Sequence, residues 1–243
     1  MKKISIVGAS SGIGKQVALN FIADGWKVGV AARREEALKE LKLQIPAQVE
    51  YEVIDITSAD ATSRLNALID KLGGMDIYFH CSGVGHQNTK IDIKVEVDTV
   101  RTNALGFTQM SVAAYNYFKD NKKQGQIAVV SSIAGTKGLG VSPSYSATKR
   151  YNYIYLDCLE QLSRIQNVNI TFTDIRPGFV TTALLDDGQK YPMQMSVEYA
   201  AKKIFKAVKR RKRVAVIDWK YSILVLFWKL IPRWLWVRLP IHT

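Results

Sequence analysis

Cysteine and histidine are scarce in this chain of 243 residues, which contains two cysteines and three histidines. Cys81 and Cys158 are too few for the disulfide framework of a small secreted domain, and residues 1–7 have the pattern of a short strand rather than of a charged and then apolar leader. No group of histidine, cysteine and carboxylate residues has the spacing of metal ligands. We therefore expect a cytoplasmic protein without a catalytic metal.

Internal repeats, low-complexity stretches and long Gly/Ser/Pro linkers are absent as well. Nothing therefore divides the chain into two folded units, and its content of 47% apolar and 23% charged residues is ordinary for one α/β domain. We assign residues 1–218 to one folded domain and residues 219–243 to a C-terminal tail.

Acidic residues are nearly missing from the C-terminal part of the chain. Residues 201–243 contain twelve of the 34 Lys and Arg residues but only one of the 21 Asp and Glu residues, Asp218. Most of the net charge of +13 belongs to this segment, and the rest of the chain is nearly neutral. Because no nucleic-acid-binding motif accompanies the basic residues, we expect no nucleic acid partner.

Short β-rich apolar runs alternate with longer amphipathic stretches along the chain. This alternation implies right-handed crossovers and a parallel sheet with helices on both faces. We predict the α/β class, as a single doubly wound Rossmann domain with strand order 3-2-1-4-5-6-7. The expected strands are 4–7, 27–31, 49–54, 76–80, 126–130, 169–174 and 214–217, and the expected helices are 14–23, 35–43, 59–72, 100–118 and 145–163.

A glycine-rich turn follows the first expected strand and leads directly into a helix. A strand that turns sharply there can bring its backbone close to a pyrophosphate, while the N–H groups of the helix N-terminus face the anion. An isolated glycine triplet is also compatible with an ordinary tight turn, but its place between strand and helix favours a dinucleotide site. The residues concerned are Gly8, Ser10, Ser11, Gly12, Ile13 and Gly14.

The end of the second expected strand carries Arg33 and Arg34 and no acidic residue. An acidic residue there would bind both ribose hydroxyls and repel a 2′-phosphate, whereas a guanidinium can pair with that phosphate. The alternative is that the arginines only begin a solvated helix, together with Glu35 and Glu36. We expect NADP(H) rather than NAD(H) as the cofactor.

Three further residues suit the transfer of a hydride and a proton to a carbonyl. A tyrosine with its usual pKa of about 10 is a poor proton donor at neutral pH, but a lysine at i+4 lies on the same helix face and its charge lowers that pKa. Tyr145 and Lys149 have this spacing, which also occurs in surface pairs without a catalytic role. Ser132 ends the fifth expected strand, where its hydroxyl would face the ligand crevice of a parallel sheet.

These motifs, in this order, resemble the short-chain dehydrogenase/reductase (SDR) family over about residues 1–217. The resemblance implies that Ser132 polarises the substrate oxygen, that Tyr145 transfers the proton, and that Lys149 binds the nicotinamide ribose and lowers the tyrosine pKa. It also implies that Asn103 holds a water of the proton relay. The alternative for Asn103 is a buried asparagine at a helix bend.

The resemblance implies further cofactor contacts after the third, fourth and sixth strands. They are Asp55 and Ile56 at the adenine, Ser82 and Gly83 where the backbone approaches the cofactor, and Pro177, Gly178, Val180 and Thr182 near the nicotinamide carboxamide.

The chain departs from the family at His80-Cys81-Ser82-Gly83, where relatives usually have Asn-Asn-Ala-Gly. The sheet-stabilising role of that asparagine is therefore not carried over to His80. We interpret His80 as a core histidine and Cys81 as a small buried apolar residue.

Two segments at the C-terminal end have open interpretations. Residues 183–195, which precede a helix that we expect Ser196 to cap, match the family's substrate lid. Their apolar residues with methionines suit a hydrophobic ligand or a loop that only covers the core. The tail combines four of the five tryptophans with Lys and Arg, but its apolar run at 221–228 is far shorter than the roughly 18 residues of a membrane span. Such a tail suits a membrane surface, a protein contact or a cover over the substrate pocket.

Taken together, the residues and the resemblance predict an oxidoreductase that transfers a hydride between NADP(H) and a carbonyl or secondary alcohol. The composition of the lid and tail favours a hydrophobic or lipid-like substrate, and a location at the inner face of a membrane is the alternative to a freely cytoplasmic one. The resemblance implies a homodimer or homotetramer built through the long helices. The alternative function is a cofactor-binding scaffold or sensor with little turnover.

Overall fold

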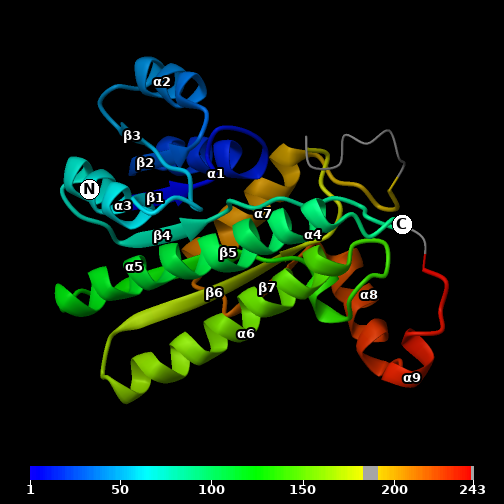
Figure 1. Ribbon diagram of the computed structural model, residues 1–243. Coiled ribbons are helices and arrows are strands. Elements are labelled where there is room, and N and C mark those ends of the chain that lie inside the picture. Colours follow the sequence, from blue (N-terminus) through cyan, green and yellow to red (C-terminus); the bar gives the residue numbers. More distant parts are fainter. Residues whose placement is uncertain (183–190, 242–243) are drawn as a thin grey trace.

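The computed structural model describes residues 1–182 and 191–241 (Figure 1). Within these residues seven strands form one parallel sheet in the order β3-β2-β1-β4-β5-β6-β7, which confirms the predicted Rossmann topology. The strands are β1 (Lys3–Val7), β2 (Lys27–Ala32), β3 (Val49–Val53), β4 (Ile77–His80), β5 (Gly125–Val130), β6 (Ile170–Pro177) and β7 (Val214–Ile217).

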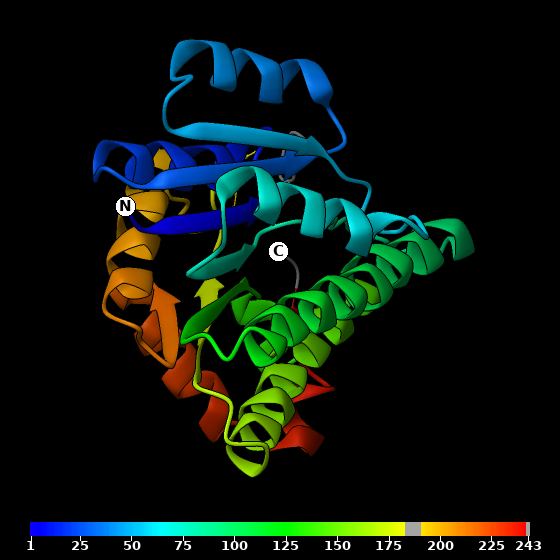
Figure 2. The same cartoon turned by 90° about the vertical axis from the view of Figure 1, so that its left-hand side faces the viewer.

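Helices cover both faces of this sheet, because buried strands without polar alternation need an apolar layer on each side. Helices α1 (Gly12–Ala23), α2 (Glu35–Gln44) and α7 (Val197–Lys209) supply one apolar core, and α3 (Ala61–Leu72), α5 (Phe107–Asp120) and α6 (Pro143–Ile165) supply the other. Figure 2 shows α1 and α7 on one side of the twisted sheet and α3, α5 and α6 on the opposite side.

The register brings the carboxyl ends of the central strands to one edge. Val7 pairs with Ala31 on β2 and with His80 on β4, and His80 pairs with Val129 on β5. The loops that follow these strands therefore begin side by side, as expected for a ligand crevice in a doubly wound sheet.

The predicted single helix over 100–118 is wrong in its beginning and in its regularity. Asp92 accepts hydrogen bonds from the amides of Lys94 and Val95, and this N-cap starts α4 (Ile93–Val100), which the sequence analysis missed. A π-helical turn, η1 (Arg101–Gly106), then joins α4 to α5. The Asn152 side chain donates to the Asn103 carbonyl oxygen at 2.8 Å, a typical cause of an interruption in the helical hydrogen-bond ladder.

The segment treated as a tail is helical. It forms α8 (Trp219–Leu230), whose N-cap Asp218 accepts from the Lys220 amide, and the short α9 (Arg233–Trp236). The two helices lie together at the lower right of Figure 1, beside the 3-10 turn η2 (Ile133–Thr136) that follows β5. The N-cap predicted at Ser196 is present, since its hydroxyl accepts from the Tyr199 amide at 3.2 Å at the start of α7.

Candidate active site

A cleft of about 610 Å³ runs along the carboxyl edge of the sheet. Its volume is in the range of small-molecule and cofactor sites. All of the predicted cofactor and catalytic residues except Asn103 line it: Gly8, Ser10, Ser11, Gly12, Ile13, Gly14, Arg33, Arg34, Asp55, Ile56, Ser82, Gly83, Ser132, Tyr145, Lys149, Pro177, Gly178, Val180 and Thr182.

The glycine turn between β1 and α1 leaves no space for side chains at two positions. A Cβ on Gly8, whose φ is +94°, would lie 2.6 Å from the Ser82 amide nitrogen, and a Cβ on Gly14 would lie 2.1 Å from the Gly8 carbonyl oxygen. The turn can therefore fold back tightly only with glycine at both positions. Ser11 forms no side-chain cap, so the first N–H groups of α1 are available to an anion in the cleft.

Arg33 and Arg34 are exposed at the end of the cleft that follows β2. The Arg34 guanidinium donates to the Ser10 hydroxyl at 3.0 Å and to the Ser11 hydroxyl at 2.5 Å, which holds it beside the glycine turn. Next to them, burial raises the pKa of the Asp55 carboxyl, but two hydrogen bonds from Thr57 and the charge of Arg33 outweigh it and leave that pKa lowered. The first end of the cleft is thus lined by two guanidinium groups and by the Ser10 and Ser11 hydroxyls.

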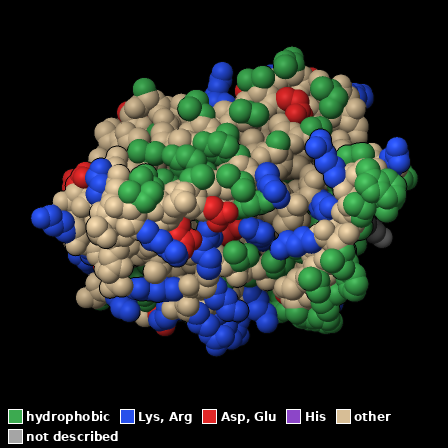
Figure 3. Space-filling view, turned by 90° about the horizontal axis from the view of Figure 1, so that it is seen from below, with side chains coloured by type: hydrophobic (Ala, Val, Ile, Leu, Met, Phe, Trp, Pro, Cys, Tyr) green, Lys and Arg blue, Asp and Glu red, His purple; other side chains and the backbone are tan. Residues whose placement is uncertain are grey.

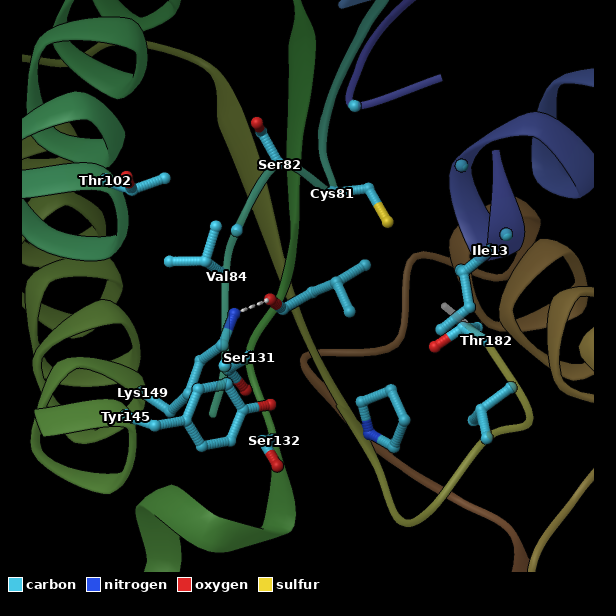
Figure 4. A pocket seen from close by; sticks show the side chains of 18 of the residues that line it. Ile13, Cys81, Ser82, Val84, Thr102, Ser131, Ser132, Tyr145, Lys149 and Thr182 are labelled. Atoms are coloured by element: carbon cyan, nitrogen blue, oxygen red, sulfur yellow. Dashed lines mark hydrogen bonds between the residues drawn. The ribbon is translucent and has the colours of Figure 1, made fainter. Parts of the chain in front are cut away.

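Tyr145, Lys149 and Ser132 meet at the other end of the cleft (Figure 4). Tyr145 and Lys149 project from α6, and the Lys149 ammonium lies 5.7 Å from the centre of the Tyr145 ring. Lys149 is 94% buried and donates to the Val130 carbonyl oxygen at 3.0 Å, at the end of β5. Ser132 follows the same strand, and its side chain lies beside the Tyr145 ring (Figure 4).

The pKa of Tyr145 is raised, whereas the sequence analysis expects it to be lowered. Burial raises the pKa of the Tyr145 phenol, the neighbouring Ser132 side chain lowers it in part, and the predicted lowering by Lys149 is not seen. Burial also lowers the pKa of Lys149 to about 8. The physical reason is that burial removes both groups from water, which disfavours the charged form of each.

Comparison with known proteins identifies the family. A family model described as short chain dehydrogenase matches residues 2–192, well over half of the chain. The chain belongs to the short-chain dehydrogenase family. Dehydrogenase/reductase SDR family member 7B of Xenopus tropicalis is 27% identical over 240 residues, which cover 88% of this chain and 76% of that protein. An uncharacterized oxidoreductase of Myxococcus xanthus is 30% identical over 236 residues, covering 93% and 91% respectively.

A solved structure has the same fold. It is the closed form of serine dehydrogenase complexed with NADP+, which superposes with a TM-score of 0.80 at 21% sequence identity and covers 88% of this chain and 94% of its own. At this identity the likeness concerns the fold of this short-chain dehydrogenase alone.

In this short-chain dehydrogenase Asn103 lies behind the wall of the cleft. It is 1% exposed within the π-helical turn, its amide oxygen accepts from the Val84 N–H at 2.8 Å, and its amide nitrogen donates to the Val84 carbonyl at 2.7 Å. Asn103 therefore positions the segment that follows β4, as a buried asparagine at a helix bend does. Its part in a water relay stays a prediction.

The replaced family motif begins with His80, the last residue of β4, which is buried as expected, whereas Cys81 is only half-buried and not fully buried as expected. The His80 Nδ1 lies 2.7 Å from the Tyr78 hydroxyl, and burial lowers the pKa of His80 to about 3, so the ring is neutral. Cys81 borders the cleft, and burial raises the pKa of its thiol to about 11. Neither side chain therefore supplies a charged group to the cleft near neutral pH.

Several residues that the sequence analysis did not single out form the rest of the wall around Tyr145. A Cβ on Gly85 would lie 2.8 Å from two carbons of the Tyr145 ring, so only glycine lets this segment pack against the tyrosine. On the other side Leu139 packs in a small apolar cluster with Trp236 of α9. The two glycines of Gly83-Val84-Gly85 are a sequence signal for a close approach of this segment to another group. No local sequence signal connects Leu139 with Trp236, because the two residues are far apart in the chain.

Most of the predicted lid, residues 183–190, lies outside the described residues. At its flanks, Phe179 and Tyr191 pack with ring centres 4.7 Å apart, and Val180 and Met195 form a parallel β-bridge. The Tyr221 hydroxyl of α8 accepts from the Phe179 amide at 3.1 Å and lies 2.9 Å from the Pro192 carbonyl oxygen. Helix α8 thus connects the two ends of the lid.

Neither a candidate metal site nor a helix that could span a membrane is present in the described ranges. No three His, Cys, Asp or Glu side chains in residues 1–182 and 191–241 are grouped closely enough to hold a metal ion. None of the helices in the same ranges has the length and hydropathy that crossing a membrane requires.

Proposed function

We propose that this protein transfers a hydride between NADP(H) and an apolar carbonyl compound or secondary alcohol. The observation that carries the proposal is the arrangement of one continuous cleft. Its first end combines the glycine turn with Arg33 and Arg34, and its second end brings together Ser132, Tyr145 and Lys149.

The cleft residues suit a nicotinamide dinucleotide phosphate. The close-packed turn at Gly8 and Gly14 lets a pyrophosphate approach the N-terminus of α1, and Arg34 with Ser10 offers donors for a 2′-phosphate. Lys149 is the donor for the nicotinamide ribose, and Thr182 stands across the cleft from Tyr145 (Figure 4). When bound, the cofactor supplies or accepts the hydride.

The three side chains at the second end handle the proton and the charge on the substrate oxygen. In the reduction, Ser132 donates a hydrogen bond to the carbonyl oxygen, and Tyr145 gives its phenolic proton to that oxygen as the C–H bond forms. The Lys149 ammonium stabilises the phenolate that remains, and solvent protonates it again. In the oxidation, the tyrosine takes the proton back from the alcohol.

The wall beyond Tyr145 supports an apolar substrate. Leu139, Ala134 and Phe179 face this part of the cleft, and Trp236 packs behind Leu139. Apolar walls around a few polar groups are typical of sites that hold hydrophobic ligands. A panel of ketones and aldehydes that differ in chain length is therefore the appropriate substrate screen.

Titration of the purified protein with NADPH and NADH tests the cofactor site. We expect tighter binding of NADPH, and we expect Arg34→Ala or Arg33→Ala to weaken NADPH binding by about tenfold while NADH binding stays the same, since each charge-assisted hydrogen bond contributes about 1.5–3 kcal/mol. Arg164→Ala, which removes an exposed arginine at the far end of α6, is the matched control. Equal affinity for both nucleotides in all variants would refute the NADP(H) preference.

Turnover of the ketone panel with NADPH tests the reaction. Tyr145→Phe removes the proton donor and keeps the ring, so kcat is expected to fall about 10²–10⁴-fold with little change in NADPH affinity. Turnover that persists in this variant would show that the proton comes from another group. A protein that binds NADPH but turns over no member of the panel would favour the scaffold or sensor function instead.

We also propose that the protein is a homodimer or homotetramer. The outer faces of α5 and α6 expose several large apolar side chains, among them Val112, Tyr151, Ile154 and Leu162. Single exposed apolar residues are ordinary, but a group on two adjacent helices favours an interface. Light scattering of the wild type and of Ile154→Glu measures the mass, which is expected to fall to that of a single chain in the variant. A single-chain mass in the wild type would contradict the proposal.

A further inference from the structure

The outer face of α8 is an unusual surface for a helix on a folded domain. Its exposed apolar side chains recur at i, i+4, i+7, i+8 and i+11, which places them on one stripe. The opposite side of the helix is also apolar, because Tyr221 and Val225 are buried against the domain. The residues of the exposed stripe are Trp219, Ile223, Leu226, Phe227 and Leu230.

The apolar surface continues onto α9 and the residues after it. Trp234 and Val237 are exposed by 61% and 69%, and Leu235 and Leu239 are exposed beside them. Figure 3 shows hydrophobic side chains gathered at the edge of the molecule where α8 and α9 lie, with lysine and arginine around them. We call these nine side chains of α8, α9 and the following residues the C-terminal apolar face.

The C-terminal apolar face is flanked by basic side chains that have no acidic partner. Lys220, Lys229, Arg233 and Arg238 form no ion pair in the described ranges, although Arg238 lies over the Trp234 ring at 5.7 Å. The acidic residue nearest to them in sequence, Asp218, is engaged with the Lys220 amide and the Tyr199 hydroxyl. The face therefore combines exposed apolar area with uncompensated positive charge.

The helices that carry this face are held firmly to the domain. The Trp236 indole donates to the Gly138 carbonyl oxygen at 2.9 Å, and the Lys137 ammonium donates to the Ile231 carbonyl and lies 5.5 Å from the Trp236 ring. Tyr221 fixes α8 to the segment at Phe179. Binding of a partner to this face therefore costs little conformational entropy, because the helices are already ordered.

We propose that the C-terminal apolar face docks on an anionic membrane surface. Exposed tryptophans lie favourably at the boundary of headgroups and acyl chains, and flanking lysines and arginines are attracted to acidic lipids. Two copies of the chain paired through this face would bring the same four basic side chains together without compensating acids, which is unfavourable. An anionic bilayer supplies both the apolar layer and the negative charge.

Docking in this way places the substrate end of the cleft at the bilayer. The inner side of α8 and α9 packs behind Leu139 and Phe179, which line the cleft next to Tyr145. The delivery of an apolar substrate from the membrane rests on the proposed function, whereas the docking itself does not.

Sedimentation with lipid vesicles tests the docking without any assay of turnover. We compare vesicles of phosphatidylcholine with vesicles of an equal mixture of phosphatidylcholine and phosphatidylserine, at low and high salt. The wild type is expected to bind the mixed vesicles at least tenfold more tightly, with binding weakened by salt. Absence of binding to the mixed vesicles, or equal binding to both kinds, would overturn the proposal.

Variants locate the surface. Leu226→Glu with Phe227→Glu is expected to lower binding to the mixed vesicles by more than tenfold, and Arg233→Glu with Arg238→Glu by at least fivefold, because each charge near the surface contributes about 1 kcal/mol. Leu43→Glu is the matched control, since Leu43 is also an exposed leucine on a helix, α2, outside this face. Unchanged binding in both double variants would overturn the proposal, as would a double variant that only lowers the mass measured by light scattering.

Thermal unfolding and NADPH titration of each variant show that the fold and the cleft are intact. A wild type that binds mixed vesicles but not NADPH would leave the docking established and refute the proposed function. A wild type that binds NADPH but no vesicles would refute the docking and leave the proposed function to be decided by turnover.

Discussion

The two ends of the cleft are built in different ways. The cofactor end uses residues that are close in sequence: the turn of Gly8–Gly14 and the arginines after β2. The substrate end uses residues from loops and helices far apart in the chain, such as Gly85, Leu139 and Tyr191, with Trp236 behind them. Tyr145 lies at this second end, in contact with the segment at Gly85.

This contrast fits the different groups that the two ends would recognise in the proposed function. A pyrophosphate and a ribose phosphate need backbone N–H groups and guanidinium groups in a fixed local geometry, which a short loop between a strand and a helix provides. An apolar substrate needs a shaped wall, and a wall can be assembled from any apolar side chains that packing brings together. Substitutions at the two ends should consequently have separable effects.

The largest effect is expected from Gly14→Ala at the cofactor end. The new Cβ would lie 2.1 Å from the Gly8 carbonyl oxygen, so the turn must open. Strain of about 3 kcal/mol corresponds to a loss of about a hundredfold in NADPH affinity, measured by fluorescence titration. Ser11→Ala keeps the turn and should change the affinity only a few-fold. A Gly14→Ala protein with wild-type NADPH affinity would show that the cofactor does not depend on this turn.

Gly85→Ala tests the contact between Gly85 and the Tyr145 ring at the second end. The added methyl group would push the Tyr145 ring, which now lies 2.8 Å from the Cβ position. Because a displacement of about 1 Å at a catalytic group costs up to about a hundredfold in rate, we expect kcat to fall tenfold to a hundredfold with NADPH affinity unchanged. Gly140→Ala is the control, since no atom lies within 4 Å of its Cβ position. Equal kcat values for the two variants would contradict the contact.

Leu139→Ala tests the substrate end alone. It removes apolar wall in front of Trp236, and kcat/KM for a long-chain ketone is expected to fall about tenfold, while a short ketone loses little. NADPH affinity should stay at the wild-type value, which steady-state kinetics and titration together would establish. A uniform loss for all chain lengths would mean that the side chain supports the fold rather than the specificity.

The smallest effect concerns pH. The pKa of Lys149 is lowered to about 8, so the ammonium form decreases as the pH rises through 8, and the charge available to the nicotinamide ribose decreases with it. We expect NADPH affinity to fall about threefold to tenfold between pH of about 7 and 9.5, as the charged hydrogen bond becomes a neutral one. Lys149→Arg keeps its charge over this range, so its affinity should vary less with pH. The same slope in both proteins would assign the change to another group.

The elements with strong local signals were predicted well. The positions of the strands, the glycine turn, the Ser196 cap and the helix that carries Tyr145 and Lys149 agree with the structure, because hydrophobic periodicity and capping are properties of neighbouring residues. The helix before Asn103 was missed although Asp92 is a good N-cap, and the π-helical turn was missed because its cause, a bond from Asn152, comes from another helix.

The spacing of residues along the chain was enough to place Tyr145 and Lys149 on one helix face and to put a tight glycine turn before α1, because both depend on geometry within a few residues. The order of the pKa effects at Tyr145, the contact of Gly85 with its ring and the wall formed by Leu139 and Trp236 depended on packing between distant segments. The same holds for α8, where the fold decided which apolar side chains are buried and which remain exposed as the C-terminal apolar face. Burial is a property of the assembled chain, and no local pattern in an apolar helix distinguishes its two sides.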